Sequence, residues 1–212
     1  MTRDKPFRAE NQQGSSFRKR NPSETTRRAP LAAEFKAYLL GALHDGTYNR
    51  LHRTFRFSQK GKMWLMTLKH ILYRLGHKSW LYQEGKKRSV YALETSARFL
   101  DLHFDPLRLR STRQRVAYVR GYFDSEGGIP HSSEARFYIQ LCQKNREEMI
   151  KVSRILETLG IHCGTIHNPS KAADPDYWRF FVRTESHQDF IQTISSWHPR
   201  KHRILQHRRK MI

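Results

Sequence analysis

An internal repeat constrains the fold of this chain more than any other feature of its sequence. Residues 55–76 read FRFSQKGKMWLMTLKHILYRLG, and residues 139–160 read IQLCQKNREEMIKVSRILETLG. Without a gap, six residues recur 84 positions later: Gln59, Lys60, Ile71, Leu72, Leu75 and Gly76 return as Gln143, Lys144, Ile155, Leu156, Leu159 and Gly160. Agreement of this kind predicts that one supersecondary unit is used twice.

Hydrophobic periodicity predicts the same order of elements in each copy. Apolar residues alternate in both, at Phe55 and Phe57 and at Ile139 and Leu141, which indicates strands with one buried face. An amphipathic helix that ends in glycine follows each strand. A second hairpin is expected at residues 77–94 and again, with a longer tip, at 161–184, and short helices are expected at 96–102 and 185–194.

An apolar helix ending in an acid and a glycine precedes each first hairpin. These segments are AYLLGALHDG at residues 37–46 and YVRGYFDSEG at residues 118–127. The predicted unit is therefore helix, hairpin, helix, hairpin, helix, in an α+β protein with a first repeat at 31–112 and a second at 113–212. Residues 1–30 are basic and lack apolar periodicity, so a flexible basic arm is expected there.

The two acid-ended helices carry small residues that would let them pack closely against each other. These helix-packing residues are Gly41, Ala42, Gly121 and Ser125. Close packing would bring Asp45 beside Glu126, where like charges are tolerable if a cation such as Mg²⁺ lies between them. Either acid alone is equally well explained as an ordinary helix end. The repetition of the pair before matching Gln-Lys strand ends favours a functional site.

The charge of the chain indicates a polyanionic partner. Forty Lys and Arg residues against 19 acids give a formal charge of +21, and nucleic acid is the first candidate. No apolar run is long enough to span a membrane and the first residues lack a hydrophobic signal core, so we expect no membrane partner and an intracellular, cytoplasmic or organellar protein that is not secreted. Cys142 and Cys163 each stand alone, which argues against a disulfide framework or a thiol-based zinc site.

The acid-ended helices also carry a family resemblance. Residues 119–127, VRGYFDSEG, resemble the nine-residue LAGLIDADG motif, and residues 38–46, YLLGALHDG, resemble the divergent first copy of single-chain, two-motif homing endonucleases. The resemblance spans about residues 34–205 and implies two αββαββα repeats related by a pseudo-twofold axis, with antiparallel, saddle-shaped DNA-binding sheets. The first motif departs from the pattern: its glycine comes one position late, and His44 stands where a small residue is usual.

The resemblance implies a monomeric, site-specific endonuclease of the intron-homing type. Such an enzyme recognises a long asymmetric site in double-stranded DNA and hydrolyses both strands to leave short 3′ overhangs. Mg²⁺ is the expected cofactor, with Mn²⁺ able to substitute and Ca²⁺ supporting binding without cleavage. The alternative is a catalytically silent DNA- or RNA-binding protein of the same fold, such as an intron-splicing maturase, for which intron RNA is a partner. Intact acids at both motif ends argue against that alternative.

The expected cleavage centre combines residues from both halves. Asp45 and Glu126 are the metal-binding acids, assisted by the backbone of Gly46 and Gly127. The resemblance assigns the organisation of active-site water to Gln59 and Gln143, and contact near the scissile phosphates to Arg108 and Lys201. A Gln can equally cap a strand end, and both cations also belong to basic runs.

Paired hairpins can form a ribbon that enters the major groove, so one face of each sheet is expected to contact DNA. The candidates in the first half are Tyr48, Arg50, His52, Thr54, Arg56, Tyr82, Glu84, Lys86, Ser89 and Tyr91. Those in the second half are Arg136, Tyr138, Gln140, His167, Asn168, Lys171, Arg179 and Phe181.

Overall fold

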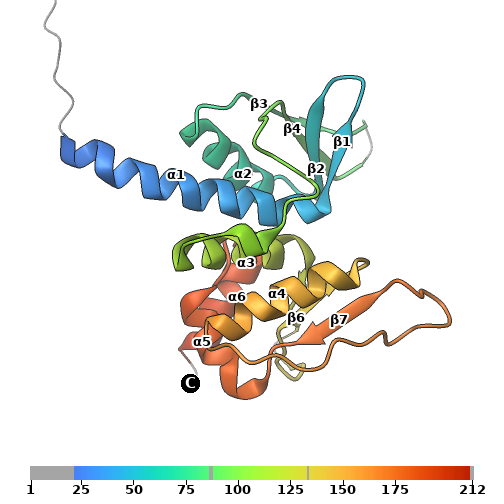
Figure 1. The fold of residues 1–212 in the computed structure, drawn as a ribbon. Helices are drawn as coiled ribbons and strands as arrows, with labels where there is room; N and C mark the ends of the chain where they lie inside the picture. The colour runs from blue at the N-terminus through green and yellow to red at the C-terminus, as the bar shows by residue number, and fades with distance from the viewer. Residues whose placement is uncertain (1–21, 86–87, 133, 211–212) are drawn as a thin grey trace, which may run out of the picture.

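Two long helices lie against each other at the centre of the molecule, and the two halves of the chain lie on opposite sides of this pair (Figure 1). The computed structural model describes residues 22–85, 88–132 and 134–210. The central helices are α1 (Pro22–Ala42) and α3 (Thr112–Glu126). No helix in the described part of the chain has the length and apolarity needed to cross a membrane.

The first half contains a four-stranded antiparallel sheet with one helix packed on it. After α1 come a 3-10 turn η1 (Leu43–Asp45), β1 (Gly46–Asn49), β2 (Thr54–Lys60), α2 (Met63–Arg74), β3 (Ser79–Gln83), β4 (Val90–Thr95) and η2 (Pro106–Arg108). The strand order is β1-β2-β4-β3. The alternation predicted for β2 is present, because Phe57 is fully buried while its neighbours Arg56 and Ser58 are partly exposed.

The second half repeats this arrangement with shorter strands. After α3 come β5 (Gly127–Gly128), β6 (Gln140–Gln143), α4 (Arg146–Thr158), β7 (Trp178–Phe181), η3 (Thr184–Ser186), α5 (His187–Thr193) and α6 (Pro199–Arg209). The sheet order is β5-β6-β7, and single bridges at Cys163 and His167 stand where the first half has its edge strand β3. The predicted α+β fold with two related halves is therefore confirmed.

Two predicted boundaries are corrected. The structure has turns at residues 96–102 in place of the expected short helix, because the Asp101 side chain accepts from the backbone N–H of His103 and Pro106 follows closely. The helix α1 begins at Pro22, before the predicted start of the folded body at Leu31. The remainder of the predicted basic arm, residues 1–21, lies outside the described residues.

The contact between α1 and α3 is backbone against backbone. A Cβ atom on Gly41 would lie 2.0 Å from the carbonyl oxygen of Tyr118, and a Cβ on Gly121 would lie 2.0 Å from that of Tyr38. Ala42 is fully buried, and the Ser125 hydroxyl lies 3.5 Å from the Gly41 carbonyl oxygen. All four predicted packing residues therefore lie in this contact, which only small side chains permit.

The helix contact explains why the first motif has its glycine one position late. Gly41 and Gly121 occupy equivalent places in it, yet four residues follow Tyr122 before α3 ends at Glu126 and only three follow Ala42 before η1 ends at Asp45. The 3-10 conformation of η1 compensates for the missing residue. Three 3-10 residues and four α-helical residues each advance about 6 Å along the axis. Both acids consequently reach a similar level.

Polar pairs join the two helices on either side of the glycine contact. The Tyr38 hydroxyl donates to Asp124 at 2.7 Å, and in the equivalent place the Tyr118 hydroxyl lies 2.7 Å from Nε2 of His44. Burial, with a smaller effect of Lys151, lowers the pKa of His44 to about 4, so its imidazole is neutral at pH 7. His44 thus replaces the usual small residue with a partner for the opposite helix.

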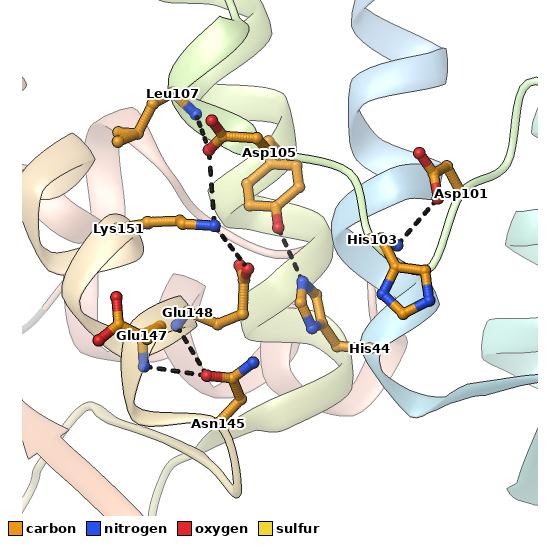
Figure 2. A network of polar contacts seen from close by, with 10 residues as sticks. His44, Asp101, His103, Asp105, Leu107, Asn145, Glu147, Glu148 and Lys151 are labelled. Atoms are coloured by element: carbon orange, nitrogen blue, oxygen red, sulfur yellow. Dashed lines mark hydrogen bonds and ion pairs between the residues drawn. The ribbon is translucent and has the colours of Figure 1, made fainter.

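The segment that connects the halves is tied to the second half by charge. Lys151 of α4 lies 3.6 Å from the Asp105 carboxylate and 3.0 Å from the Glu148 carboxylate, and this network lies close to His44 (Figure 2). Asp105 also accepts from the backbone N–H of Leu107 and so caps the N-terminus of η2. The interface between halves therefore includes the connecting segment as well as the central helices.

We expect Gly121→Ala to lower the free energy of unfolding by about 3 kcal/mol, because the added methyl group forces the two helix backbones apart. Chemical denaturation measures the change. Gly128→Ala is the matched control, since its nearest neighbour would be 3.7 Å away and the expected change is below about 1 kcal/mol. Equal destabilisation by the two substitutions would contradict the proposed packing constraint.

Candidate active site

Asp45 is the last residue of η1, which directly follows α1, and Glu126 is the last residue of α3, near enough for the charge of Asp45 to affect it. Each acid is followed by the glycine that begins a strand, Gly46 of β1 or Gly127 of β5. Burial and then repulsion from Asp45 raise the pKa of Glu126 to about 7. Burial is also the main cause that raises the pKa of Asp45. The structure therefore brings the two acids together as the sequence predicted, and their mutual repulsion is unfavourable without a cation.

Each acid is contacted by one glutamine, which comes from the same half of the chain. Gln59, near the end of β2, donates its side-chain amide to the Asp45 carboxylate. Gln143, at the end of β6, lowers the pKa of Glu126 through a hydrogen bond. Both residues point to the side of their sheet that faces the central helices, in register with Tyr91 and Trp178 respectively. The duplication of Gln in the sequence therefore corresponds to a duplicated contact.

Lys201 supplies positive charge that acts on both acids. It lies in the first turn of α6, is only 4% exposed, and donates to the carbonyl oxygens of Phe123 at 2.6 Å and Asp124 at 2.9 Å. Burial lowers its pKa to about 8, while its charge lowers the pKa of both Asp45 and Glu126. Arg108, the residue expected to match Lys201 in the first half, is exposed at the end of η2. The structure thus places one of the two predicted cations at the site.

Asp124 positions Lys201, a role that was not predicted from the sequence. Its carboxylate is 1% exposed and accepts from Tyr38, from Ser196, and from the backbone N–H groups of Trp197 at 2.8 Å and His198 at 3.1 Å. These contacts hold the segment immediately before α6. The available signal in the sequence was an acid within an otherwise apolar helix, which indicates a buried partner network.

The residues at the site fit a hard divalent cation only as part of a larger ligand set. In the described ranges, no three or more His, Cys, Asp or Glu side chains gather as a metal cluster. Mg²⁺ commonly binds one or two carboxylates and completes its shell with water and phosphate oxygens. Asp45 and Glu126 meet that requirement, and repulsion between them would be relieved by the ion. The Glu126 carbonyl oxygen already accepts from the Cys142 thiol at 3.1 Å.

The exposed face of the first sheet differs in part from the prediction. The hairpin pairs Asn49 with Thr54 across a four-residue turn, which places Tyr48 opposite Phe55, on the core side. Tyr91 pairs with Gln59 on that same side, and Ser89 has the same parity as Tyr91. The prediction that Tyr48, Ser89 and Tyr91 lie on the DNA-contacting face is therefore corrected, because all three have the parity of the opposite face.

Five of the other candidates in the first half fall into two groups. Thr54, Arg56 and Tyr82 share the opposite face of the sheet. Arg50 and His52 lie in the turn, and Lys86 lies outside the described residues. Trp80, which is 50% exposed and pairs with Glu94, joins the exposed face although the sequence did not single it out.

The second sheet gathers most of its candidates on one face. Gln140 pairs with Phe181, and Arg179 bridges to His167, whose ring stacks on Phe181 at 6.3 Å. The Tyr138 ring lies 5.9 Å from that of Phe181. Arg136 and Lys171 are exposed. The side chain of Asn168 donates to the carbonyl oxygens of Asp174 and Pro175, so it shapes its own loop.

Comparison with known proteins agrees with this architecture. Residues 113–195 match the family described as the LAGLIDADG-like domain. No curated protein sequence matches the chain significantly. The whole fold, with its paired acid-ended helices and two antiparallel sheets, is a LAGLIDADG fold in a single chain, and the resemblance in the sequence is confirmed.

The fold is similar to solved structures of an endonuclease and of a second protein. A structure from work on mesophilic variants of the homing endonuclease I-DmoI is 20% identical, with 83% of this chain and 98% of that chain covered and a TM-score of 0.61. I-DmoI in complex with DNA and Mn is 21% identical, with coverage of 77% and 97% and a TM-score of 0.57. Full-length DUF199/WhiA from Thermatoga maritima is 17% identical, with coverage of 91% and 68% and a TM-score of 0.61.

The raised pKa of Glu126 predicts a pH-dependent stability change in the metal-free protein. Its folded-state pKa of about 7 exceeds the ordinary value of 4.5, so folding favours the protonated form and stability falls as pH rises through that range. Glu126→Gln should therefore stabilise the protein at pH 8, by up to about 3 kcal/mol. At pH 5 the effect should be much smaller.

Denaturation curves without divalent metal at pH 5 and pH 8 test this expectation. Glu134→Gln removes the same charge at an exposed position and should change stability little at either pH. An effect of Glu126→Gln that is equal at both pH values would show that the carboxylate is not held in a destabilised, charged state.

Proposed function

We propose that this protein is a site-specific, divalent-metal-dependent endonuclease that cleaves both strands of DNA. The observation that carries the proposal is the pairing of Asp45 with Glu126 at the helix ends, where each acid is contacted by a glutamine from its own half. A purely structural helix end has no need for two partly desolvated acids that repel each other. Their arrangement is suited to a cation that contacts phosphate.

The residues around the acids have separate roles in this proposal. Asp45 and Glu126 would hold Mg²⁺, and the bound ion would polarise the scissile phosphate and lower the pKa of water. Gln59 and Gln143 orient the acids and the attacking water by hydrogen bonding. Lys201 contributes positive charge beside the Glu126 end of the site. Because Lys201 is buried beside the acids while Arg108 is exposed at the end of η2, we infer that the two strands are cut at centres of unequal strength.

Double-stranded DNA is the proposed partner. I-DmoI, whose fold this chain shares, has been solved with its target DNA and Mg, and with DNA and Mn or Ca. The charge of +21 favours a polyanion, and the two sheets present different side chains, which suits a long asymmetric site read by a monomer. Short 3′ overhangs and an intron-homing role complete the proposal by analogy with the family.

A binding protein without cleavage activity is the competing function. The same fold occurs in DUF199/WhiA, so the fold by itself does not establish cleavage. The retention of both acids and both glutamines in contact favours the nuclease here. An intron RNA partner belongs to this competing function.

We expect Asp45→Asn and Glu126→Gln to abolish cleavage of a selected DNA site in Mg²⁺, because each replaces a metal-binding carboxylate. Both variants should still bind the site in Ca²⁺, since the sheets are unchanged. A gel assay for cleavage and a shift assay for binding measure the two properties.

The matched control for these variants is Asp189→Asn, on the second-half helix α5, which should cut normally. Cleavage at the wild-type rate by both Asp45→Asn and Glu126→Gln would refute the assignment of the centre. Failure of the wild-type protein to cut any DNA in a randomised library would favour the non-cleaving alternative.

DNA affinity should fall steeply with salt, because each phosphate contact by Lys or Arg releases counterions. If about six phosphates are contacted, the affinity is expected to drop roughly a thousandfold between 50 and 200 mM salt. Binding titrations in Ca²⁺ measure this slope. A nearly flat response would contradict an interface dominated by the basic charge of the chain.

A further inference from the structure

Two neighbouring groups of polar contacts lie on the exposed face of the first sheet. Arg56 of β2 forms an ion pair with Glu84 at 2.7 Å. Glu94 of β4 accepts from the Thr54 hydroxyl at 3.1 Å and from the Tyr82 hydroxyl at 2.5 Å. Under the proposed function this face contacts DNA, and the inference below rests on that assignment. Two carboxylates on a DNA-binding face require an explanation, because they oppose phosphate.

The register of the strands shows how these contacts are held. Arg56 pairs with Glu94, and Tyr82 pairs with Ala92 one row away. The Arg56–Glu84 pair therefore spans β4 diagonally, and the Tyr82–Glu94 hydrogen bond joins the adjacent strands β3 and β4 diagonally. Ala92 lies beneath this crossing and is fully buried although it has the parity of the exposed face. Arg56 accordingly lies flat across the sheet, and its side chain is only 28% exposed.

The carboxylates of Glu84 and Glu94 differ in the hydrogen-bond acceptor capacity that remains free for a ligand. Both oxygens of Glu94 are occupied by Thr54 and Tyr82, so Glu94 is a positioning residue. Glu84 is 40% exposed and uses one oxygen for Arg56, which leaves acceptor capacity toward a ligand. The Arg56 guanidinium likewise has donors beyond its contact with Glu84. The pair presents a donor group immediately beside an acceptor.

That order of groups matches one base pair. In the major groove a G·C pair presents two acceptors on guanine beside the amino donor of cytosine. Arg donates well to the guanine acceptors, and a Glu carboxylate accepts from the cytosine amino group. An A·T pair presents an amino donor between two acceptors, so it would set that donor against the Arg56 donors. The pair therefore distinguishes G·C from A·T by charge and by hydrogen-bond direction.

We propose that Arg56 and Glu84 together read a single G·C base pair, with Arg56 on guanine and Glu84 on the cytosine of the same pair. The second sheet has no equivalent reader at the matching strand positions, which hold Gln140, Cys142, Arg179 and Phe181. Arg179 there donates to His167 at 3.3 Å and lies over the Phe181 ring. The Arg56–Glu84 pair would thus contact one half of the DNA site only, which makes the recognised sequence asymmetric.

Selection of bound sites from a randomised DNA library in Ca²⁺ tests the proposal, because it needs binding but no cleavage. The wild-type protein should enrich G·C at one position of the half-site contacted by the first sheet. Glu84→Gln should reduce discrimination at that position by roughly tenfold, equivalent to about 1.4 kcal/mol, and leave the other positions unchanged. Arg56→Lys should reduce the preference for guanine at the same position, because the ammonium lacks the planar fork.

Glu147→Gln on the exposed start of α4 is the control, since it removes one acid away from this face and should leave the selected sequence intact. A base preference that survives both Glu84→Gln and Arg56→Lys unchanged overturns this proposal while leaving the nuclease proposal standing. If the wild-type protein selects no sequence at all, site-specific recognition itself fails, and this inference fails with it.

Discussion

The backbone contact between α1 and α3 is the constraint on which the rest of the structure depends. Gly41 and Gly121 let each helix approach the carbonyl group of the other to a distance that a methyl group would forbid. This approach fixes the separation and orientation of the two halves, and with them the two sheets. It also determines that both helices end at one place. The pair of acids is thus a consequence of how closely the helices pack.

Placing two acids at that point has an energetic cost. Burial raises the pKa of both carboxyl groups, and repulsion from Asp45 raises that of Glu126 further. The surroundings offset this cost partly, through Gln59 on one acid, a hydrogen bond from Gln143 to the other, and the nearby charge of Lys201. A bound divalent cation would remove most of the remainder. Repulsion between the acids lowers the stability of the metal-free protein, and its relief on binding adds to the affinity for a cation and phosphate.

The two halves share a plan and differ in its chemistry. A 3-10 turn in the first motif replaces one helical residue of the second, and His44 occupies the place of Asp124 in pairing with a tyrosine of the opposite helix. Asp124 binds the segment before α6 and so positions Lys201 at the site, whereas Arg108 is exposed at the end of η2. The asymmetry at the centre therefore has the same origin as the asymmetry of the sheets: one fold encoded by two diverged sequences.

The sequence by itself determined the repeated unit, the small-residue helix faces, and the two acids with their glutamines, because periodicity and spacing are local properties that a duplication displays twice. Only the tertiary structure decided which side of the sheet Tyr48 and Tyr91 occupy, since the number of residues in a hairpin turn sets strand parity. It also decided the burial of Asp124, whose partners come from segments distant in the chain. The direction of a side chain depends on strand register, and its contacts depend on segments that are distant in the chain. A local sequence pattern specifies neither.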